Sequence, residues 1–217
     1  MVRLVWVKPR SPYGRYVGLV EEPTLDPAEN LRREAEYMRQ APTPSFRVWR
    51  NSDCVVLGRF LRAEDEVRLQ EAERLGVPVF KRVSGGGAVF HDPGNLNYSL
   101  YLEEGQLPAF GVEASLRALS FPVTRLLDSL GLPWEWVAPN SVYVAGRKVS
   151  GSAQARSRGR VLHHGTLLVD TDLEKMWRLL KGGGRSRLAP VVNLSEIVPG
   201  IEVPQVEKAV RECIKEV

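Results

Sequence analysis

The sequence predicts an α+β fold in which a mixed β-sheet packs with helices. Segments with the alternation of strands and segments with the helical period of about 3.6 residues both occur, but they do not follow a regular strand–helix–strand order. The chain of 217 residues is long enough to form its own core, and neither a linker nor an internal repeat divides it. We therefore expect residues 1–217 to form one domain.

The first half of the chain contains two predicted helices among several predicted strands. Asp26 followed by Pro27 is an N-cap and a first-turn proline, so a helix begins there, and it ends before Pro42. A second helix is expected over 67–75, where Gly76 ends it. Apolar and β-branched runs predict strands at 4–7, 16–20, 46–49, 54–57, 77–80, 88–90 and 96–102.

The second half contains three predicted helices. Apolar residues at steps of three and four predict a helix over 116–130, which Pro122 is expected to kink. Thr171 and Glu174 have the spacing of a capping box at the start of the next helix, and the last helix begins at Pro204. Strands are predicted at 134–137, 141–144 and 161–169.

The composition excludes several classes of protein. With 43% hydrophobic and 26% charged residues, the chain is neither a disordered tail nor a coiled coil. No apolar run reaches the roughly eighteen residues of a membrane span, and the N-terminus does not read as a signal peptide, so we expect a cytoplasmic location without membrane contact. Cys54 and Cys213 lack the spacing of a disulfide framework or a thiolate metal site, and both are expected in the core.

Three consecutive glycines follow the strand predicted at 77–80, in the segment KRVSGGGAVFHDPGN at 81–95. Glycines let a backbone approach a ligand closely and expose successive N–H groups, which suits a phosphate or an adenosine, and Arg82 could pair with a phosphate. The segment is not a Walker loop, because no Gly-Lys-Ser/Thr closes it. By composition alone, a plain tight turn and a ligand-binding loop are equally good interpretations.

Two further segments carry candidate functional residues. Lys148 lies among small residues in NSVYVAGRKVSGSAQ at 140–154, although an isolated lysine is more often a solvated surface charge. His163 and His164 point to opposite faces of a strand, so they cannot jointly chelate one metal ion in the usual way. We expect one of them to be structural and the other to lie near a pocket.

Together these segments resemble the lipoate-protein ligase family, within the wider biotin and lipoate ligase fold. The resemblance is carried by RVSGGGAVFHDPGNLNYS at 82–99, NSVYVAGRKVSGSAQ at 140–154 and HHGTLLV at 163–169. Weaker agreement at 26–39, 55–59 and 191–197 extends it over most of the chain. Three motifs in the family's order are highly specific, and they imply a biotin/lipoate ligase-like catalytic domain.

The resemblance implies a two-step reaction. Lipoate reacts with ATP to give lipoyl-AMP, and the lipoyl group then passes to a lysine on a lipoyl domain of a 2-oxoacid dehydrogenase E2 subunit or on a glycine-cleavage H protein. The lysine matching Lys148 would be catalytic, because it touches both the phosphate and the acyl carbonyl. The implied residues for binding ATP and lipoyl-AMP are Arg82, Ser84, Gly85, Gly86, Gly87, Ala88, Val89, Phe90, His91, Asn140, Lys148, Gly151, Ser152, His164 and Gly165.

Two departures from the family pattern affect these expectations. The family often has an aspartate that contacts Mg²⁺ where this chain has Ser141, so Mg²⁺ is expected with ATP but no residue is assigned as a metal ligand. Long members of the family continue into a small C-terminal domain that assists adenylation, whereas this chain ends at Val217. We therefore expect either a separate accessory subunit or an enzyme limited to the transfer step.

Other functions are weaker interpretations. Related octanoyl- and lipoyl-transferases use a cysteine nucleophile, which in one branch precedes the glycine-lysine motif, but no cysteine lies between Trp134 and Lys148. Biotin ligase is disfavoured because its arginine-rich glycine loop is replaced here by SGGGAVFH. The net charge of +4 and the basic run at 181–187 allow a nucleic-acid-binding module, but no recognised motif supports it, so we expect no nucleic-acid partner.

Overall fold

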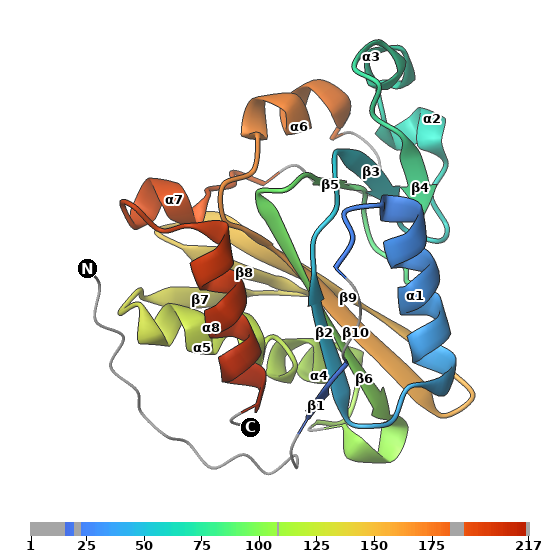
Figure 1. Cartoon of the computed structure of the whole chain (residues 1–217), viewed down its shortest axis with the longest axis vertical. Helices are drawn as coiled ribbons and strands as arrows, with labels where there is room; N and C mark the ends of the chain where they lie inside the picture. The colour runs from blue at the N-terminus through green and yellow to red at the C-terminus, as the bar shows by residue number, and fades with distance from the viewer. Residues whose placement is uncertain (1–15, 20–22, 108, 183–188, 216–217) are drawn as a thin grey trace.

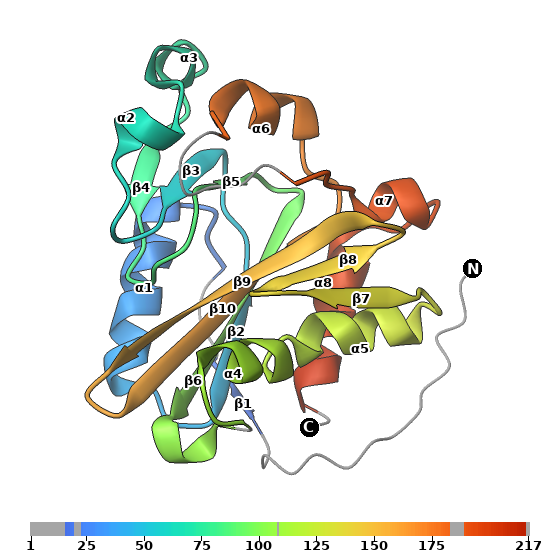
Figure 2. The same ribbon diagram turned by 180° about the vertical axis from the view of Figure 1, so that it is seen from behind.

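A computed structural model describes residues 16–19, 23–107, 109–182 and 189–215. The strand predicted at 4–7 lies outside these residues, and so does most of the basic run at 181–187. Within the described part, a large twisted sheet is covered by helices. A small sheet stands at one end of it, together with α2 (Ala63–Glu66), α3 (Leu69–Arg74) and α6 (Leu173–Leu179) (Figures 1 and 2). The α+β prediction with a mixed sheet is confirmed.

The larger sheet has seven strands among the described residues, in the order β1-β2-β6-β10-β9-β8-β7. β1 is parallel to β2, and every other neighbouring pair is antiparallel. The strands are β1 (Val17–Gly18), β2 (Ser45–Trp49), β6 (Asn95–Glu103), β7 (Trp134–Val137), β8 (Ser141–Val144), β9 (Arg147–Ser157) and β10 (Arg160–Leu168).

The smaller sheet has the order β4-β3-β5, with β3 parallel to β4 and antiparallel to β5. Its strands are β3 (Cys54–Leu57), β4 (Val79–Lys81) and β5 (Val89–His91). The helices are α1 (Pro27–Gln40), α2 (Ala63–Glu66), α3 (Leu69–Arg74), the 3₁₀ turn η1 (Glu104–Gln106), α4 (Val112–Ala118), α5 (Phe121–Ser129), α6 (Leu173–Leu179), α7 (Leu194–Ile197) and α8 (Val203–Lys215).

Strand alternation divides the packing between the two faces of the larger sheet. On one face, Leu100 and Val161 join a core to which α5 and α8 contribute. On the other face, Tyr101 and Leu162 pack with Met38 of α1. A separate core lies under the small sheet and includes residues of β3, β5, α3 and α6.

Several predicted elements differ from those observed. The helix expected over 67–75 is the shorter α3, which begins at Leu69 because Val67 forms a β-bridge with Leu180, and α2, which precedes it, was not predicted. The helix expected over 116–130 is not kinked but divided: Pro122 lies in the first turn of α5, where its missing N–H costs nothing. The N-cap of α6 is Asp172, whose side chain accepts from the backbone N–H of Lys175, and not Thr171.

The longest strand was not predicted as a strand at all. β9 spans eleven residues, Arg147–Ser157, and is rich in small residues: three serines, two alanines and Gly151. Such residues have low strand propensity, and pairing with β8 and β10 on both sides overrides it. This strand carries Lys148, so the motif read from the sequence as a small-residue stretch is part of the central sheet.

Candidate active site

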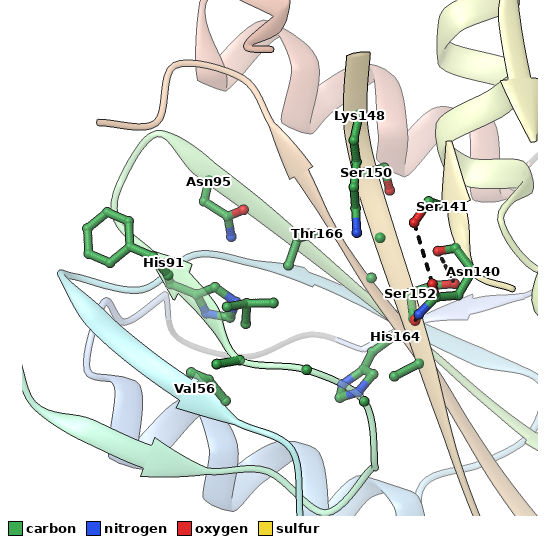
Figure 3. Close-up of a pocket in the computed structure, with 18 of the residues that line it drawn as sticks. Val56, His91, Asn95, Asn140, Ser141, Lys148, Ser150, Ser152, His164 and Thr166 are labelled. Atoms are coloured by element: carbon green, nitrogen blue, oxygen red, sulfur yellow. Dashed lines mark hydrogen bonds between the residues drawn. The ribbon is translucent and has the colours of Figure 1, made fainter. Parts of the chain in front are cut away.

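A cavity of about 810 Å³ lies on the α1 side of the larger sheet, between β9 and β10 and the small sheet. This volume is in the range of sites for small ligands. Most of the predicted binding residues line it (Figure 3). The predicted residues in the lining are Arg82, Gly86, Gly87, Ala88, Val89, Phe90, His91, Asn140, Lys148, Gly151, Ser152, His164 and Gly165.

Lys148 extends from β9 into the cavity, between Thr166 on one side and Asn140 and Ser141 on the other (Figure 3). Burial lowers the pKa of its ammonium group from the ordinary lysine value. A Cβ atom at position 151 would lie 2.8 Å from Lys148 Nζ, so Gly151 provides the space that the lysine side chain fills. The side chain expected to be catalytic is therefore held in a region largely shielded from water.

The backbone of Lys148 is fixed from two directions. Lys148 pairs with Tyr143 of β8, and its N–H donates to the Pro190 carbonyl at 2.8 Å. The Val192 N–H donates in turn to the Lys148 carbonyl at 3.0 Å. The segment that follows 183–188 thus lies directly beside the lysine.

Asn140, which directly precedes β8, is hydrogen-bonded to β9 at the same side of the cavity. Its Nδ2 donates to the Ser152 carbonyl at 2.6 Å, and the Ser152 N–H donates to the Asn140 carbonyl at 2.9 Å. Ser141 Oγ lies 3.4 Å from Asn140 Oδ1 (Figure 3). These contacts fix the edge of the cavity next to Lys148.

The glycine loop, residues 82–88, connects β4 to β5, and Arg82 shapes it. The Arg82 guanidinium donates to the carbonyls of Gly85 and Gly87 at 2.6 and 2.9 Å, and to the Val56 carbonyl at 3.2 Å. Burial lowers the pKa of Arg82 to about 10. The arginine expected to pair with a phosphate thus donates its hydrogen bonds to backbone carbonyls, two of them in the loop itself, although it also borders the cavity.

Close contacts explain why glycine occupies two positions near this loop. Gly86 has a φ of 92°, and a Cβ there would lie 2.8 Å from Arg82 Nη2. A Cβ at Gly58, directly after β3, would lie 2.1 Å from the Gly86 carbonyl oxygen. The role of Gly58 was missed in the sequence, where it appeared only as the end of a strand.

Two predicted site residues lie outside the cavity lining, and two others border the cavity without offering it a free side chain. Ser84 and Gly85 do not line the cavity, and Ser84 Oγ instead lies 2.6 Å from His164 Nε2, behind the loop. Gly165 contributes only backbone to the cavity, since a Cβ there would lie 2.6 Å from Tyr98 in the core. His91 is buried, receives a hydrogen bond from Asn51 at its Nδ1, and has a pKa lowered by burial to about 3.

The two neighbouring histidines lie in different environments, as expected. His163 is fully buried, lies 3.3 Å from the Tyr98 hydroxyl, and has a pKa lowered by burial to about 3. His164 faces the cavity. The structure thus places one histidine in the core and the other beside the cavity, as the sequence predicts.

Glu34 of α1 was not predicted as a site residue. It lines the cavity with only 1% of its surface exposed, and its Oε1 lies 2.9 Å from His164 Nδ1 and 2.6 Å from Ser99 Oγ. Burial raises the pKa of Glu34, but His164, Ser99 and Arg47 outweigh burial and lower it. The sequence contained one signal: Glu34 falls on the apolar stripe of α1, between Leu31 and Met38.

Neither cysteine belongs to the site. Cys54 and Cys213 are buried and outside the cavity lining, and burial raises the pKa of Cys54 to about 12. The prediction that both are core residues is confirmed. A thiol that is protonated and buried does not act as a nucleophile.

The donor set of the cavity does not fit a magnesium ion held by the protein. Mg²⁺ is bound through carboxylates, and Glu34, the carboxylate in the described lining, is already bonded to His164 and Ser99. Among the described residues, no three His, Cys, Asp or Glu side chains are grouped as metal ligands.

No helix in the described part of the chain has the length and apolar content to cross a membrane.

The comparisons with known proteins agree on one family. The model of the lipoyl protein ligase A/B catalytic domain matches residues 26–215. Two curated relatives named "Probable lipoate-protein ligase A" come from Mycoplasma pneumoniae, at 36% identity over 72% of this chain, and Mycoplasma genitalium, at 32% identity over 83%. The matches cover 48% and 56% of those proteins, so the chain spans about half the length of these relatives.

Solved structures show the same similarity. A bi-partite lipoate protein ligase from Thermoplasma acidophilum, studied with its E2 lipoyl domain, has a TM-score of 0.78 and 28% identity, over 93% of this chain and 82% of that one. A Thermoplasma acidophilum structure with bound lipoic acid has a TM-score of 0.79 and 27% identity, over 94% and 84%. A lipoate-protein ligase A bound with ATP has a TM-score of 0.80 and 26% identity, over 94% and 85%.

Proposed function

This chain belongs to the lipoyl protein ligase A/B catalytic-domain family, and from that premise we propose that it is a lipoate-protein ligase, which activates lipoate with ATP and transfers the lipoyl group to a lysine of an acceptor protein. The observation that carries the proposal is Lys148. Its ammonium group points into the cavity, and burial is the cause of its altered pKa, with no carboxylate of the described residues acting on it. A cation held in this way is available to a negatively charged ligand.

In the proposed first step, a carboxylate oxygen of lipoate attacks the α-phosphorus of ATP. A bond between oxygen and phosphorus forms, and pyrophosphate leaves with the electron pair of the broken bond. Charge develops on the phosphoryl oxygens in the transition state, and a cation already in position stabilises that charge. Lys148 would supply it, and partial exclusion of water strengthens its effect.

In the proposed second step, the uncharged ε-amine of an acceptor lysine attacks the acyl carbonyl of lipoyl-AMP. An amide bond forms, AMP leaves, and the amine gives up a proton. Lys148 would stabilise charge on the carbonyl oxygen and on the departing phosphate. The acyl group is already activated, so no nucleophile from the protein is needed, which agrees with the burial of Cys54 and Cys213.

The glycine loop and the strand after it are the proposed nucleotide site. Gly86 and Gly87 bring backbone close to the cavity, and Val89 and Phe90 contribute an apolar wall for the ligand. Arg82 and Ser84 would act mainly by holding the loop. Gly85 lies outside the cavity lining and belongs with them, and the other proposed ligand contacts are Ala88, His91, Asn140, Gly151, Ser152, His164 and Gly165.

The structures of relatives with bound ATP and bound lipoic acid support ATP and lipoate as substrates. The bi-partite relative and its E2 lipoyl domain support two further proposals for this chain: a lipoyl domain as the acceptor, and a separate accessory protein for the adenylation step. A glycine-cleavage H protein is the alternative acceptor. Mg²⁺, expected with ATP, has no site among the described side chains and is assigned none.

The test is a comparison of the two steps with purified protein. We expect lipoyl transfer from supplied lipoyl-AMP to an isolated lipoyl domain, and we expect release of pyrophosphate from ATP and lipoate to require the accessory protein. Full ATP-dependent activity without any added protein would contradict the accessory-subunit proposal. An acyl-thioester trapped on Cys54 or Cys213 would instead establish a transferase.

A further inference from the structure

A line of hydrogen bonds runs behind the glycine loop from Arg82 to a buried carboxylate. Arg82 Nε donates to Ser84 Oγ at 2.9 Å, and Ser84 Oγ lies 2.6 Å from His164 Nε2. His164 Nδ1 lies 2.9 Å from Glu34 Oε1, which also accepts from Ser99 Oγ at 2.6 Å. The line thus joins the glycine loop to β10, α1 and β6.

The fold assembles these groups from separate parts of the chain. Arg47, Ser99 and His164 are cross-strand neighbours on β2, β6 and β10, so their side chains form a row on one face of the sheet. Glu34 meets this row from α1. No local stretch of sequence contains the arrangement, which exists only when α1 packs on the sheet.

The donors and acceptors fix a direction along the line. An ionised Glu34 can only accept, so His164 Nδ1 is the donor to it. The nearest acceptor for the Ser84 hydroxyl is then His164 Nε2 at 2.6 Å, since the Gly85 carbonyl is 3.4 Å away. Ser84 Oγ in turn accepts from Arg82, and each link depends on the acceptor that Glu34 provides at the end.

Serine, histidine and a carboxylate in this order also describe an acyl-transfer triad, but the surroundings of Ser84 exclude that role. Ser84 is only 1% exposed and does not line the cavity, so an acyl carbonyl has no access to its Oγ. Its lone pair is already engaged by Arg82. The line therefore holds structure in place and does not attack substrate.

We infer that Glu34 is a positioning residue that fixes the glycine loop in its ligand-binding shape by way of His164 and Ser84. Ser84 orients Arg82 at Nε, and Arg82 then holds the carbonyls of Gly85 and Gly87. Turning these carbonyls toward Arg82 sets the peptide planes of the loop before any ligand arrives. The inference deepens the proposed function and rests on it for the kinetic measurements below, but not for the measurement of loop motion.

A change in stability alone does not test the positioning role. Leu31 and Met38 flank Glu34 on the same stripe of α1, so a leucine at position 34 would continue the stripe. Replacing a whole buried ion pair with well-packed apolar groups is often neutral or stabilising, but removing one partner is destabilising because it leaves the other buried and uncompensated. Glu34→Leu leaves Arg47 and His164 in place, so it is expected to lower stability in any case, and the motion of the glycine loop is the measurement that tests the positioning role.

The decisive variants are Glu34→Leu, which removes the acceptor and keeps the volume, and Glu34→Gln, which keeps an oxygen that accepts from His164. Glu36→Leu is the matched control, because Glu36 lies on the same helix with an exposed side chain paired with Arg32. Ser84→Ala removes the other end of the line. All four are compared with the unmodified chain by hydrogen exchange, thermal unfolding and kinetics.

We expect amide exchange over 85–88 to become about tenfold faster in Glu34→Leu and in Ser84→Ala, with little change in Glu34→Gln and none in Glu36→Leu. The double variant Glu34→Leu, Ser84→Ala should show no further increase in the exchange rate, because both changes break the same line of hydrogen bonds. In the transfer assay, KM for lipoyl-AMP should rise more than kcat falls. The melting temperature of Glu34→Leu should fall, because Arg47 and His164 lose the carboxylate beside them.

Unchanged exchange over 85–88 in Glu34→Leu would overturn the positioning role, as would equal loosening in Glu34→Gln, since the oxygen acceptor would then be irrelevant. If Glu34→Leu does not fold, Ser84→Ala and Glu34→Gln give the same contrast. A chain that binds and turns over neither ATP nor lipoyl-AMP would refute the proposed function. The exchange result would still decide the role of Glu34.

Discussion

Lys148 combines two properties that sequence alone does not reveal together. Its side chain occupies space left by Gly151, and its backbone is bonded to the 190–192 segment as well as to β8. The cation therefore has little freedom to move away from a ligand in the cavity. A group fixed before the reaction costs no reorganisation when charge develops, which is the main source of electrostatic catalysis.

Replacing Lys148 with alanine should abolish both adenylation and transfer while leaving the fold intact. Loss of a cation that acts in the transition state costs roughly 3 kcal/mol or more, which corresponds to a drop in rate of about a hundredfold or greater. Stopped-time assays of pyrophosphate release and of lipoyl transfer measure the two steps. Lys208→Ala, at an exposed site on α8, is the control, and turnover of Lys148→Ala close to the unmodified rate would remove Lys148 from the mechanism.

At the scale of elements, the contact between the end of β3 and the glycine loop governs the shape of the nucleotide site. Gly58→Ala places a methyl group within 2.1 Å of the Gly86 carbonyl oxygen, so the loop must move away from β3. We expect affinity for lipoyl-AMP to fall by about tenfold or more. Calorimetry measures it against Gly105→Ala, where an added Cβ meets nothing within 4 Å, and equal affinities in the two variants would contradict the steric argument.

Elements with a strong local pattern were predicted well. The strands at 54–57, 134–137 and 141–144 agree with the structure to the residue, since each has an apolar or alternating run between clear turn residues. β9 was missed because its serines, alanines and Gly151 have low strand propensity, and the strand depends on pairing with its two neighbours. The helix α7 has four residues, too few to show an apolar period, and its Asn193–Glu196 capping box was overlooked.

The site residues, too, were predicted where the sequence pattern is local and missed where packing brings distant segments together. Lys148 and the glycine loop were found through motifs that are contiguous in sequence. The line from Arg82 to Glu34 joins segments up to 130 residues apart, as in the contact between His164 and Glu34, and packing of α1 on the sheet creates it. A single chain shows such long-range partners only indirectly, here as a carboxylate on an apolar stripe.

At the scale of the whole molecule, two buried histidines make the fold sensitive to acid. In the folded protein the pKa of His91 and the pKa of His163 are each lowered to about 3, whereas an unfolded histidine has an ordinary value of 6.5. Unfolding therefore takes up protons between these values, so stability is fully present above about pH 6.5 and is lost as the pH falls. Glu34, with its lowered pKa, adds to the loss at lower pH.

We expect the free energy of unfolding to fall by about 3 kcal/mol between about pH 7.5 and about pH 5.5, from the proton uptake of the two histidines. Urea denaturation at the two values measures the difference. The slope m should stay constant, because the surface exposed on unfolding is the same. Stability that is independent of pH over this range would show that both histidines accept protons in the folded state, and a fall of about half the expected size would show that one of them does.

The cavity lies between the larger sheet and the core under the small sheet with α3 and α6. Its walls are drawn from both parts, with His164 and Lys148 on strands of the larger sheet and Phe90 and Met176 in the small-sheet core. A ligand that fills it therefore acts as a cross-brace between two parts of the molecule. We expect the small-sheet core to open at lower cost than the rest in the free protein, and the occupied protein to melt as one cooperative unit.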